Sequence, residues 1–367
     1  MPADSRVDAA REGERILTIC NACRYCEGYC AVFPALELRT NFSSANLDYL
    51  ANLCHNCAEC YYACQYAPPH EFAVNVPKTL AQIRARSYQR YAWPAPLVAA
   101  FRRNGLITSV TLVISLALWI ATTNGPNTGP AQFYEAVSHR AMVTIFGAVS
   151  IFVLAALTVG CVRFCRESAD LGKSSTDFTA LKHGLSDALR LTYLYGAGQG
   201  CTYPQDQRSL ARWWFHHLTF YGFLLCFAAT TVAAIYHYAF GWRAPYGYFS
   251  LPVLLGTIGG IGLLAGTAGL FFLKQRGDIA TRDPKQDGMD LAFIALLFFT
   301  SATGLLLLAL RGTSAMSLLL SIHLATVSAF FVMIPYGKFV HGIYRLAALV
   351  RYALEQSRGK GRNATGH

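Results

Sequence analysis

Charged residues are scarce in this chain of 367 residues. Asp, Glu, Lys and Arg together make up 14% of it, whereas hydrophobic residues make up 54%. Soluble domains usually contain roughly 25% charged residues. The shortage therefore argues against a water-soluble enzyme as the whole protein, and it predicts a membrane domain with a smaller attached domain.

An N-terminal secretion signal is also lacking. Residues 1–16 (MPADSRVDAAREGERI) are charged throughout and contain no apolar core of the kind that a signal peptide needs. We therefore expect the N-terminal region to remain in the cytoplasm, where thiols are kept reduced. Eight of the twelve cysteines lie within residues 20–64. In a reducing compartment, clustered cysteines indicate metal ligands more than disulfides.

The clustered cysteines form a duplicated motif. Residues 20–30 (CNACRYCEGYC) have the spacing C-x2-C-x2-C-x3-C, and residues 54–64 (CHNCAECYYAC) repeat it 34 positions later. This spacing is typical of bacterial two-cluster ferredoxins, in which the fourth cysteine of each motif binds the other cluster. We therefore predict two [4Fe–4S] clusters. One is held by Cys20, Cys23, Cys26 and Cys64, and the other by Cys54, Cys57, Cys60 and Cys30.

Two structural zinc sites are the alternative for these cysteines. Four-thiolate zinc sites usually take their ligands as two separated C-x2-C pairs, which the triplet spacing fits poorly. The motifs depart from the ferredoxin pattern in one respect, because Ala31 and Gln65, and not proline, follow the fourth cysteine. His55 lies inside the second motif but out of register with the repeat, so we interpret it as a neighbour of the ligands.

Six long apolar stretches follow residue 90, and each is long enough for the ~20 residues of a membrane-spanning helix. We therefore predict a mostly α-helical protein of two domains. Residues 1–90 would form a small ferredoxin-like iron–sulfur domain, and residues 91–367 a six-helix transmembrane bundle like that of a b-type cytochrome. The apolar stretches cover about 105–123, 141–162, 213–239, 249–273, 289–310 and 315–337.

Lysine and arginine concentrate in alternate loops between these stretches. They are frequent before the first stretch, between the second and third, between the fourth and fifth, and after the sixth. By the positive-inside rule, both termini and the iron–sulfur domain then face the cytoplasm. The formal charge of +11 is thus a topology signal, and we expect no binding of nucleic acid.

The long loop between the second and third stretches contains two further features. Residues 178–194 (FTALKHGLSDALRLTYL) have apolar side chains at helical spacing, which predicts an amphipathic helix on the face of the membrane. Residues 195–205 (YGAGQGCTYPQ) are rich in turn formers. Their glycines are not a dinucleotide-binding fingerprint, since no strand precedes them, and we expect contact with the iron–sulfur domain or a partner.

Histidines at membrane depth are the second group of candidate ligands. His216, His217 and His237 lie in the third stretch, and His323 and His341 bracket the sixth. In one continuous helix, the 18-residue spacing of His323 and His341 would place both on one face, ~27 Å apart. In an antiparallel pair of helices, His216 or His217 would face His341, and His237 would face His323. Facing histidines in a helix bundle are typical axial ligands of b-type haem.

The pattern leaves several choices open. His216 precedes His237 by three heptads, which favours His216 over His217 as the ligand, and both one and two haems fit. Lys338 and Arg345 at the cytoplasmic end would pair either with haem propionates or with an anionic headgroup. The glycines of residues 256–269 (GTIGGIGLLAGTAG) indicate either close helix packing or room for a porphyrin.

The remaining histidines and cysteines receive structural interpretations. We place His70, His139 and His183 at the surface. The thiols outside the two motifs are interpreted as buried or interfacial residues without a ligand role. They are Cys161, Cys165, Cys201 and Cys226.

Several blocks of the sequence together resemble one family, that of tricarballylate-utilisation protein B, also called citrate-utilisation protein B. The resemblance covers nearly the whole chain. It implies a bacterial inner-membrane protein that reoxidises the flavin of an FAD-dependent tricarballylate dehydrogenase and passes electrons to the respiratory chain. The 18-residue histidine spacing also resembles the haem-binding helix of nitrate reductase gamma subunits, which is an architectural likeness only. Besides the cysteine motifs, the blocks are GCTYPQ, RWWFHHLTFYGFLLCFAAT, GWRAPYGYFSLPVLLG, MDLAFIALLFFTSATGLLLLALR and IPYGKFVHGIYRLAALV.

We therefore expect an electron-transfer subunit without acid–base catalytic residues of its own. Electrons from the partner's flavin would pass through both clusters to haem b and then to quinone in the lipid bilayer. One alternative is a haem quinone reductase subunit of another dehydrogenase. Another is a proton-coupled transporter whose iron–sulfur domain senses the redox state. The haem α-band in an optical spectrum distinguishes the electron carrier from the transporter.

Overall fold

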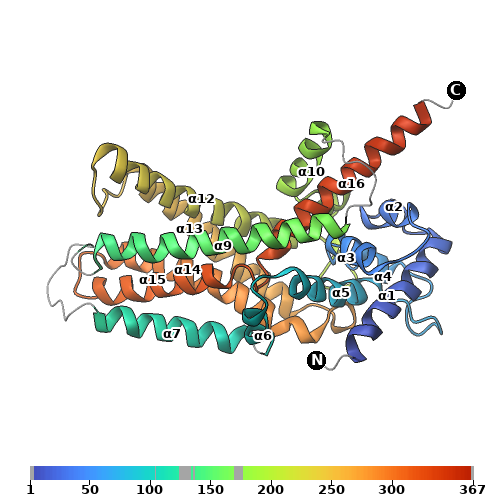
Figure 1. Ribbon diagram of the computed structural model, residues 1–367, viewed down its shortest axis with the longest axis horizontal. Coiled ribbons are helices and arrows are strands. Elements are labelled where there is room, and N and C mark those ends of the chain that lie inside the picture. Colours follow the sequence, from blue (N-terminus) through green and yellow to red (C-terminus); the bar gives the residue numbers. More distant parts are fainter. Residues whose placement is uncertain (1–3, 104, 124–133, 135–136, 169–176, 365–367) are drawn as a thin grey trace.

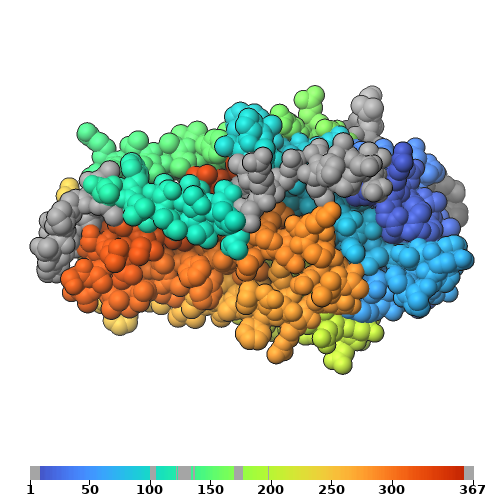
Figure 2. Space-filling model, turned by 90° about the horizontal axis from the view of Figure 1, so that it is seen from below, coloured from blue at the N-terminus to red at the C-terminus, as the bar shows by residue number. Residues whose placement is uncertain are grey.

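The computed structural model describes residues 4–103, 105–123, 134, 137–168 and 177–364. The molecule is elongated, with long helices aligned along its axis and the cysteine-rich N-terminal region at one end (Figure 1). The space-filling view shows the same division, with the N-terminal residues forming one end of the body (Figure 2). Almost all regular structure in the described residues is helical.

The cysteine-rich region is built from helices and turns only between Asp4 and Tyr91. The ends of these helices follow local sequence signals. Ser43 caps α3 by accepting a hydrogen bond from the Asn46 amide, and Asn75 caps α5 in the same way from the Lys78 amide. The predicted ferredoxin-like domain is therefore helical. Its helices are α1 (Asp4–Cys23), α2 (Val32–Glu37), α3 (Ser44–Leu53), α4 (Glu59–Tyr62) and α5 (Val76–Tyr91).

Five helices in the described residues are long and apolar enough to cross a membrane, and α7 is a shorter apolar helix over Gly105–Ile120. The six predicted stretches correspond to these six helices. Neighbouring helices pack in the sequence α12–α13–α14–α15, with α7 and α9 against α15. The six are α7 (Gly105–Thr123), α9 (His139–Ser168), α12 (Ala211–Phe240), α13 (Leu251–Gln275), α14 (Asp287–Leu310) and α15 (Met316–Met333).

The glycines of α13 let this helix approach α12 closely. A Cβ added to Gly266 would lie 2.5 Å from the amide nitrogen of Thr219, and one added to Gly269 would lie 2.2 Å from the ring of Phe215. Real Cβ atoms do not approach neighbours so closely. Of the two interpretations of this glycine-rich stretch, the structure therefore supports close helix packing.

The prediction of one continuous helix through His323 and His341 is wrong. Helix α15 ends at Met333, residues 334–339 form turns, and α16 begins at Val340. Pro335 has no amide hydrogen to donate and clashes with the preceding turn, which ends the helix. The amide of Gly337 then closes a turn onto the Met333 carbonyl at 2.8 Å. His341 therefore lies on a different helix from His323, and the argument from a shared face fails.

Helix α16 (Val340–Ala364) was not foreseen, and it joins the two predicted domains. It packs against α3, α9 and α10. The rings of Tyr91, Phe164 and Tyr344 meet in one core, with Phe164 5.5 Å from Tyr91 and 5.2 Å from Tyr344. Further along α16, the buried Arg39 forms an ion pair with Glu355 at 2.5 Å. The cysteine-rich N-terminal region and the region of long apolar helices thus share a hydrophobic core.

The predicted amphipathic segment forms α10 (Phe178–Arg190) followed by the single turn of α11 (Thr192–Tyr195). Its small residues face α16, since a Cβ on Gly184 would lie 2.7 Å from the Val350 Cα. Its large apolar side chains point outward, with Phe178 79% exposed. The remaining elements are α6 (Ala95–Arg103), η1 (Gly196–Gly198), β1 (Cys201–Thr202), β2 (Arg208–Ser209), η2 (Ile279–Thr281) and η3 (Pro284–Gln286).

Candidate functional site: two cysteine loops and a histidine pair

The two cysteine motifs share one backbone feature although their secondary structure differs, since Cys20 and Cys23 lie in the last turn of α1 and residues 54–58 are irregular. The first begins at the end of α1, and the second begins at Cys54, which caps the end of α3. Arg24 and Ala58 occupy equivalent positions in the repeat, directly after the second cysteine, and have φ angles of 56° and 64°. Positive φ is uncommon for residues other than glycine. The two loops therefore share this left-handed residue but not their whole backbone, since Asn56 also has a positive φ, of 54°, whereas its counterpart Ala22 lies in α1.

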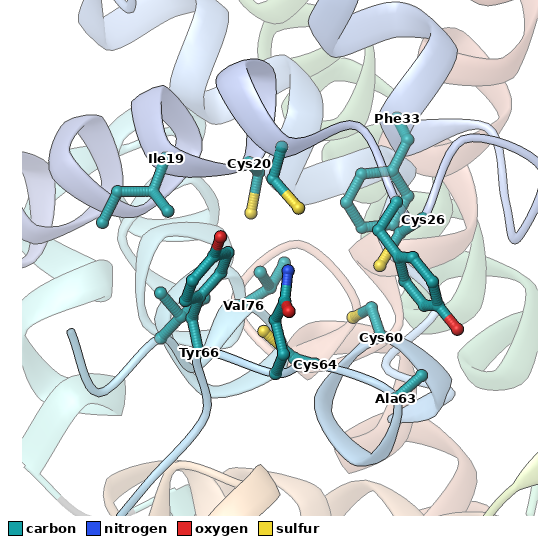
Figure 3. A pocket seen from close by; sticks show the side chains of 13 residues that line it. Ile19, Cys20, Cys26, Phe33, Cys60, Ala63, Cys64, Tyr66 and Val76 are labelled. Atoms are coloured by element: carbon teal, nitrogen blue, oxygen red, sulfur yellow. The ribbon is translucent and has the colours of Figure 1, made fainter. Parts of the chain in front are cut away.

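Cysteines from both motifs surround one cavity of about 220 Å³ (Figure 3). The sulfur atoms of Cys20, Cys26, Cys60 and Cys64 point into this space, and Cys23 also lines it. The lining thus includes the whole first predicted set, together with Cys60 of the second. Cys64 is the fourth cysteine of the second motif, so its place here agrees with ligands exchanged between the motifs.

Burial makes these thiols reluctant to ionise. Burial and the neighbouring Cys26 raise the pKa of Cys20 to about 12, and burial and Cys64 do the same for Cys26. Bound iron reverses this preference, because its positive charge stabilises thiolates. The site therefore suits a cation that compensates several thiolates at once. Within the described residues, no three His, Cys, Asp or Glu side chains converge closely enough to hold a single metal ion.

The second predicted set also gathers. Burial and the nearby Cys54 raise the pKa of Cys30 to about 12. Burial, with Cys54 and Cys30 as neighbours, raises the pKa of Cys60 well above its usual value. The Asn56 amide donates to the Cys54 sulfur at 3.4 Å. Cys30 of the first motif therefore lies among the first three cysteines of the second.

The β1–β2 hairpin covers the second cysteine loop. The pKa of Cys57 is raised well above its usual value, mainly by a hydrogen bond with Cys201 and further by burial. The hydroxyl of Thr202 donates to the Cys57 carbonyl at 3.3 Å. Strand β1 lies in the turn-rich segment 195–205 that we expected to contact the iron–sulfur domain or a partner, and β2 follows that segment. Sequence reasoning gave no signal that Cys201 would lie beside a predicted ligand.

Three arginines from distant elements donate to the second cysteine loop. Arg84 of α5 donates to the Cys54 carbonyl at 2.6 Å, and Arg345 of α16 donates to the same carbonyl. Arg212 of α12 donates to the Asn56 carbonyl at 2.7 Å. Cys54 ends α3, so the first two arginines also cap the negative end of that helix dipole.

The structure brings His216 and His341 together. Their ring centroids are 6.1 Å apart, with the rings at 74° to each other. The Nδ1–H of His341 donates to the Lys338 carbonyl at 2.5 Å, which leaves Nε2 with a free lone pair. Burial and the adjacent Arg345 hold the pKa of His341 well below its usual value, so the ring is neutral. The Nδ1 of His216 is buried without a hydrogen-bond partner in the described structure.

The neighbouring His217 points elsewhere. Its Nδ1 lies 3.0 Å from the Trp213 carbonyl, and its ring stacks on Tyr221 at 5.6 Å. His216 and His217 therefore face different neighbours, as the 100° step between successive helix residues requires.

The histidines at the far end do not form the predicted pair. His237 stacks on His139 with centroids 4.1 Å apart, and in the described structure it has no ring contact with His323. The Nδ1 of His323 instead lies 3.0 Å from the hydroxyl of Thr303. We expected His139 at the surface; it remains partly exposed there, and its ring lies against that of His237.

The two predicted cations have protein partners. Lys338 forms an ion pair with Asp290 at 2.7 Å, and Asp290 also meets Lys274 at 2.8 Å. Burial lowers the pKa of Lys338, although Asp290 opposes this effect. Arg345 contacts the cysteine loop, and no acidic partner is found for it among the described residues.

The sequence matches two protein-family models. Residues 97–362 match the family described as citrate utilization protein B, and residues 13–90 match the citrate utilization protein B Fer4-like domain. The chain is similar to citrate utilization protein B of Escherichia coli, with 49% identity over 364 residues, which cover 97% of this chain and 95% of that protein. No solved structure matches the chain. The two matched regions divide at the junction of α5 and α6.

Proposed function

The chain belongs to the citrate utilization protein B family, and from this premise we propose that it is a membrane electron-transfer protein. It takes electrons from the reduced flavin of a soluble dehydrogenase and delivers them to quinone in the bacterial inner membrane. The partner is an FAD-dependent dehydrogenase of tricarballylate or a citrate-like acid. The iron–sulfur domain and both termini lie on the cytoplasmic side.

Two [4Fe–4S] clusters fit the cysteine loops. The observation that carries this assignment is the cavity lined by Cys20, Cys23, Cys26 and Cys64, because it draws its fourth thiol from the other motif. Crosswise ligation is the arrangement that this spacing has in two-cluster ferredoxins. The set of Cys30, Cys54, Cys57 and Cys60 holds the second cluster by the same rule.

One b-type haem fits the pair His216 and His341. A metal–imidazole nitrogen bond is about 2 Å long, so two imidazoles on opposite sides of one iron have centroids about 6 Å apart. The observed separation of 6.1 Å matches this distance. The stacked rings of His237 and His139, 4.1 Å apart, are too close for such a sandwich. The geometry therefore supports one haem at the cytoplasmic end, with His216 as its ligand and not His217.

Clusters and haem, when bound, accept and release single electrons, and thereby connect a two-electron flavin to a membrane acceptor. The protein's contribution is to place them in order. The first site lies at the surface, since Tyr25 on its rim is 65% exposed. The second site is tied by Arg212 and Arg345 to the helices that carry the histidine pair. Electrons therefore enter at the first site and leave through the second.

Cofactor analysis of the purified protein tests this function. We expect about eight iron and eight sulfide per chain in the clusters, and a haem α-band in the reduced-minus-oxidised spectrum. His216→Ala should abolish the α-band and leave the sulfide content unchanged, while His217→Ala, the matched control, should keep both. An α-band that survives in His216→Ala but not in His217→Ala would show that His217, and not His216, is the haem ligand. Protein without any haem would refute the electron path into the membrane.

A further inference from the structure

Helices α12 and α16 each carry a histidine and an arginine four residues apart. Arg212 lies one turn before His216, and Arg345 lies one turn after His341. Residues at this spacing share a face of a helix. The two histidines approach each other, and the two arginines both reach the second cysteine loop. Two helices that are distant in sequence thus each place a histidine and an arginine next to the second cysteine loop.

The positive charge at this junction lacks a protein counter-charge. In the described part of the chain, Arg84, Arg212 and Arg345 bond to backbone carbonyls of the loop, and none forms an ion pair with a carboxylate. Arg84 is only 5% exposed to solvent. Buried cations are costly unless negative charge compensates them. A four-thiolate cluster and the propionates of a haem are the anions that the proposed function would place beside these arginines.

We propose that Arg212 and Arg345 are positioning residues that hold the Cys54–Cys57 loop beside the histidine pair and raise the reduction potentials of both neighbouring cofactors. This inference rests on the proposed function. A fixed positive charge stabilises the reduced, more negative form of a cofactor, and hydrogen bonds and nearby charge are known determinants of cluster and haem potentials. The pair therefore makes the second cluster and the haem better electron acceptors than the first cluster.

The simpler interpretation is that these arginines only clamp two domains together. Each holds a loop carbonyl, and Arg345 also donates to the Asn52 carbonyl at 3.1 Å. A clamp needs hydrogen bonds, whereas an effect on potential needs charge. The two interpretations therefore differ in whether lysine can replace arginine. Arg→Lys keeps the positive charge, which the effect on potential needs, but loses the branched hydrogen-bond donor, which the clamp needs.

Redox titration of the full-length protein in detergent separates the interpretations. Clusters are followed by electron paramagnetic resonance and haem by its α-band, in the unaltered protein and in Arg345→Gln, Arg345→Lys, Arg212→Gln and Arg276→Gln. Arg276 is the control, since it is an exposed cation at the same end of the membrane helices and is stacked on Phe272. We expect each glutamine variant at Arg212 or Arg345 to lower the potentials of the second cluster and the haem. The expected change is about tenfold in the equilibrium constant for reduction, or about 59 mV.

The first cluster should not shift in any variant, and Arg345→Lys should keep the original potentials. Unchanged potentials in glutamine variants that retain their cofactors would overturn the inference and leave a clamp. If Arg345→Gln loses a cofactor, the test passes to Arg345→Lys. Lowered reduction potentials in Arg345→Lys, which keeps the positive charge, would also overturn the inference. Absence of haem or clusters from the unaltered protein would instead refute the proposed function, so the two failures are distinguishable.

Discussion

At the scale of single residues, the informative feature is where each fourth cysteine lies. Cys64 belongs to the second motif in sequence but lines the cavity of the first, and Cys30 lies among the cysteines of the second. A chain that ligated each cluster within one motif would keep Cys30 with Cys20 and Cys64 with Cys54. The exchange ties the two loops together, so each cluster would depend on both halves of the duplication.

Serine variants test this exchange. Because Cys20 and Cys64 surround one cavity, Cys20→Ser and Cys64→Ser should alter the same cluster signal in electron paramagnetic resonance, while Cys54→Ser should alter the other. Each variant should lose at most about four of eight iron atoms. Cys165→Ser is the control, since that thiol is exposed on α9 and distant in sequence from both motifs. A Cys64→Ser signal that matches Cys54→Ser would show ligation within each motif.

Residue contacts were predictable from the sequence only where a repeat or a period encodes them. The meeting of cysteines from both motifs in one cavity follows from the duplicated spacing. The approach of His216 to His341 follows from the antiparallel arrangement predicted for the helices, whereas the heptad argument relied on a pairing of His237 with His323 that the described structure does not show. The contact of His139 with His237 joins residues nearly one hundred positions apart, and no local pattern records it. The same holds for Cys201 beside Cys57, whose neighbourhood depends on how the hairpin docks.

At the scale of elements, apolar length predicted the long apolar helices well but not where the last one ends. The stretch 315–337 is apolar throughout, yet α15 stops at Met333. Hydropathy does not register that Pro335 lacks an amide donor, which is what breaks the helix. Helix α16 escaped prediction because its six charged residues interrupt the apolar sequence, so that hydropathy alone does not single it out. The break matters for the site, because it places His341 on α16, where its ring lies 6.1 Å from the ring of His216 on α12.

Close packing of α12 and α13 should be essential for placing His216. In Gly266→Ala the added Cβ would lie 2.5 Å from the Thr219 amide and 2.8 Å from the Phe215 carbonyl, so the helices must separate. We expect a loss of roughly 1–3 kcal/mol of stability, seen as a lower melting temperature in detergent, together with reduced haem content. Gly262→Ala is the matched control, because its Cβ would meet no atom closer than 3.5 Å. Equal melting temperatures for both variants would contradict this account of the glycine stripe.

At the scale of the whole molecule, the polar parts collect at one end. The N-terminal domain, α10 and α16 lie together at one end of the long axis, and the turn between α12 and α13 lies at the other (Figure 1). Polar contacts fix the N-terminal domain to the segment between α13 and α14, including a hydrogen bond from Tyr62 to Asp278 at 2.9 Å and one from Asn75 to the Ala280 carbonyl at 2.7 Å. Together with the shared core, these contacts make the cysteine-rich domain an integral part of the molecule.

This arrangement predicts which ends of α13 are accessible from each side of the membrane. Gly247 and Arg276 flank α13 and are both exposed, and a side chain at Gly247 would meet open space. In spheroplasts, a membrane-impermeant maleimide should label Gly247→Cys, whereas Arg276→Cys should react only after the membrane is opened. The unaltered chain is the control for its twelve native thiols. Because a single helix separates the two positions, labelling of Arg276→Cys in intact spheroplasts would invert the topology. The cysteine loops would then face away from the cytoplasm, and a cytoplasmic flavoprotein could not be the electron donor.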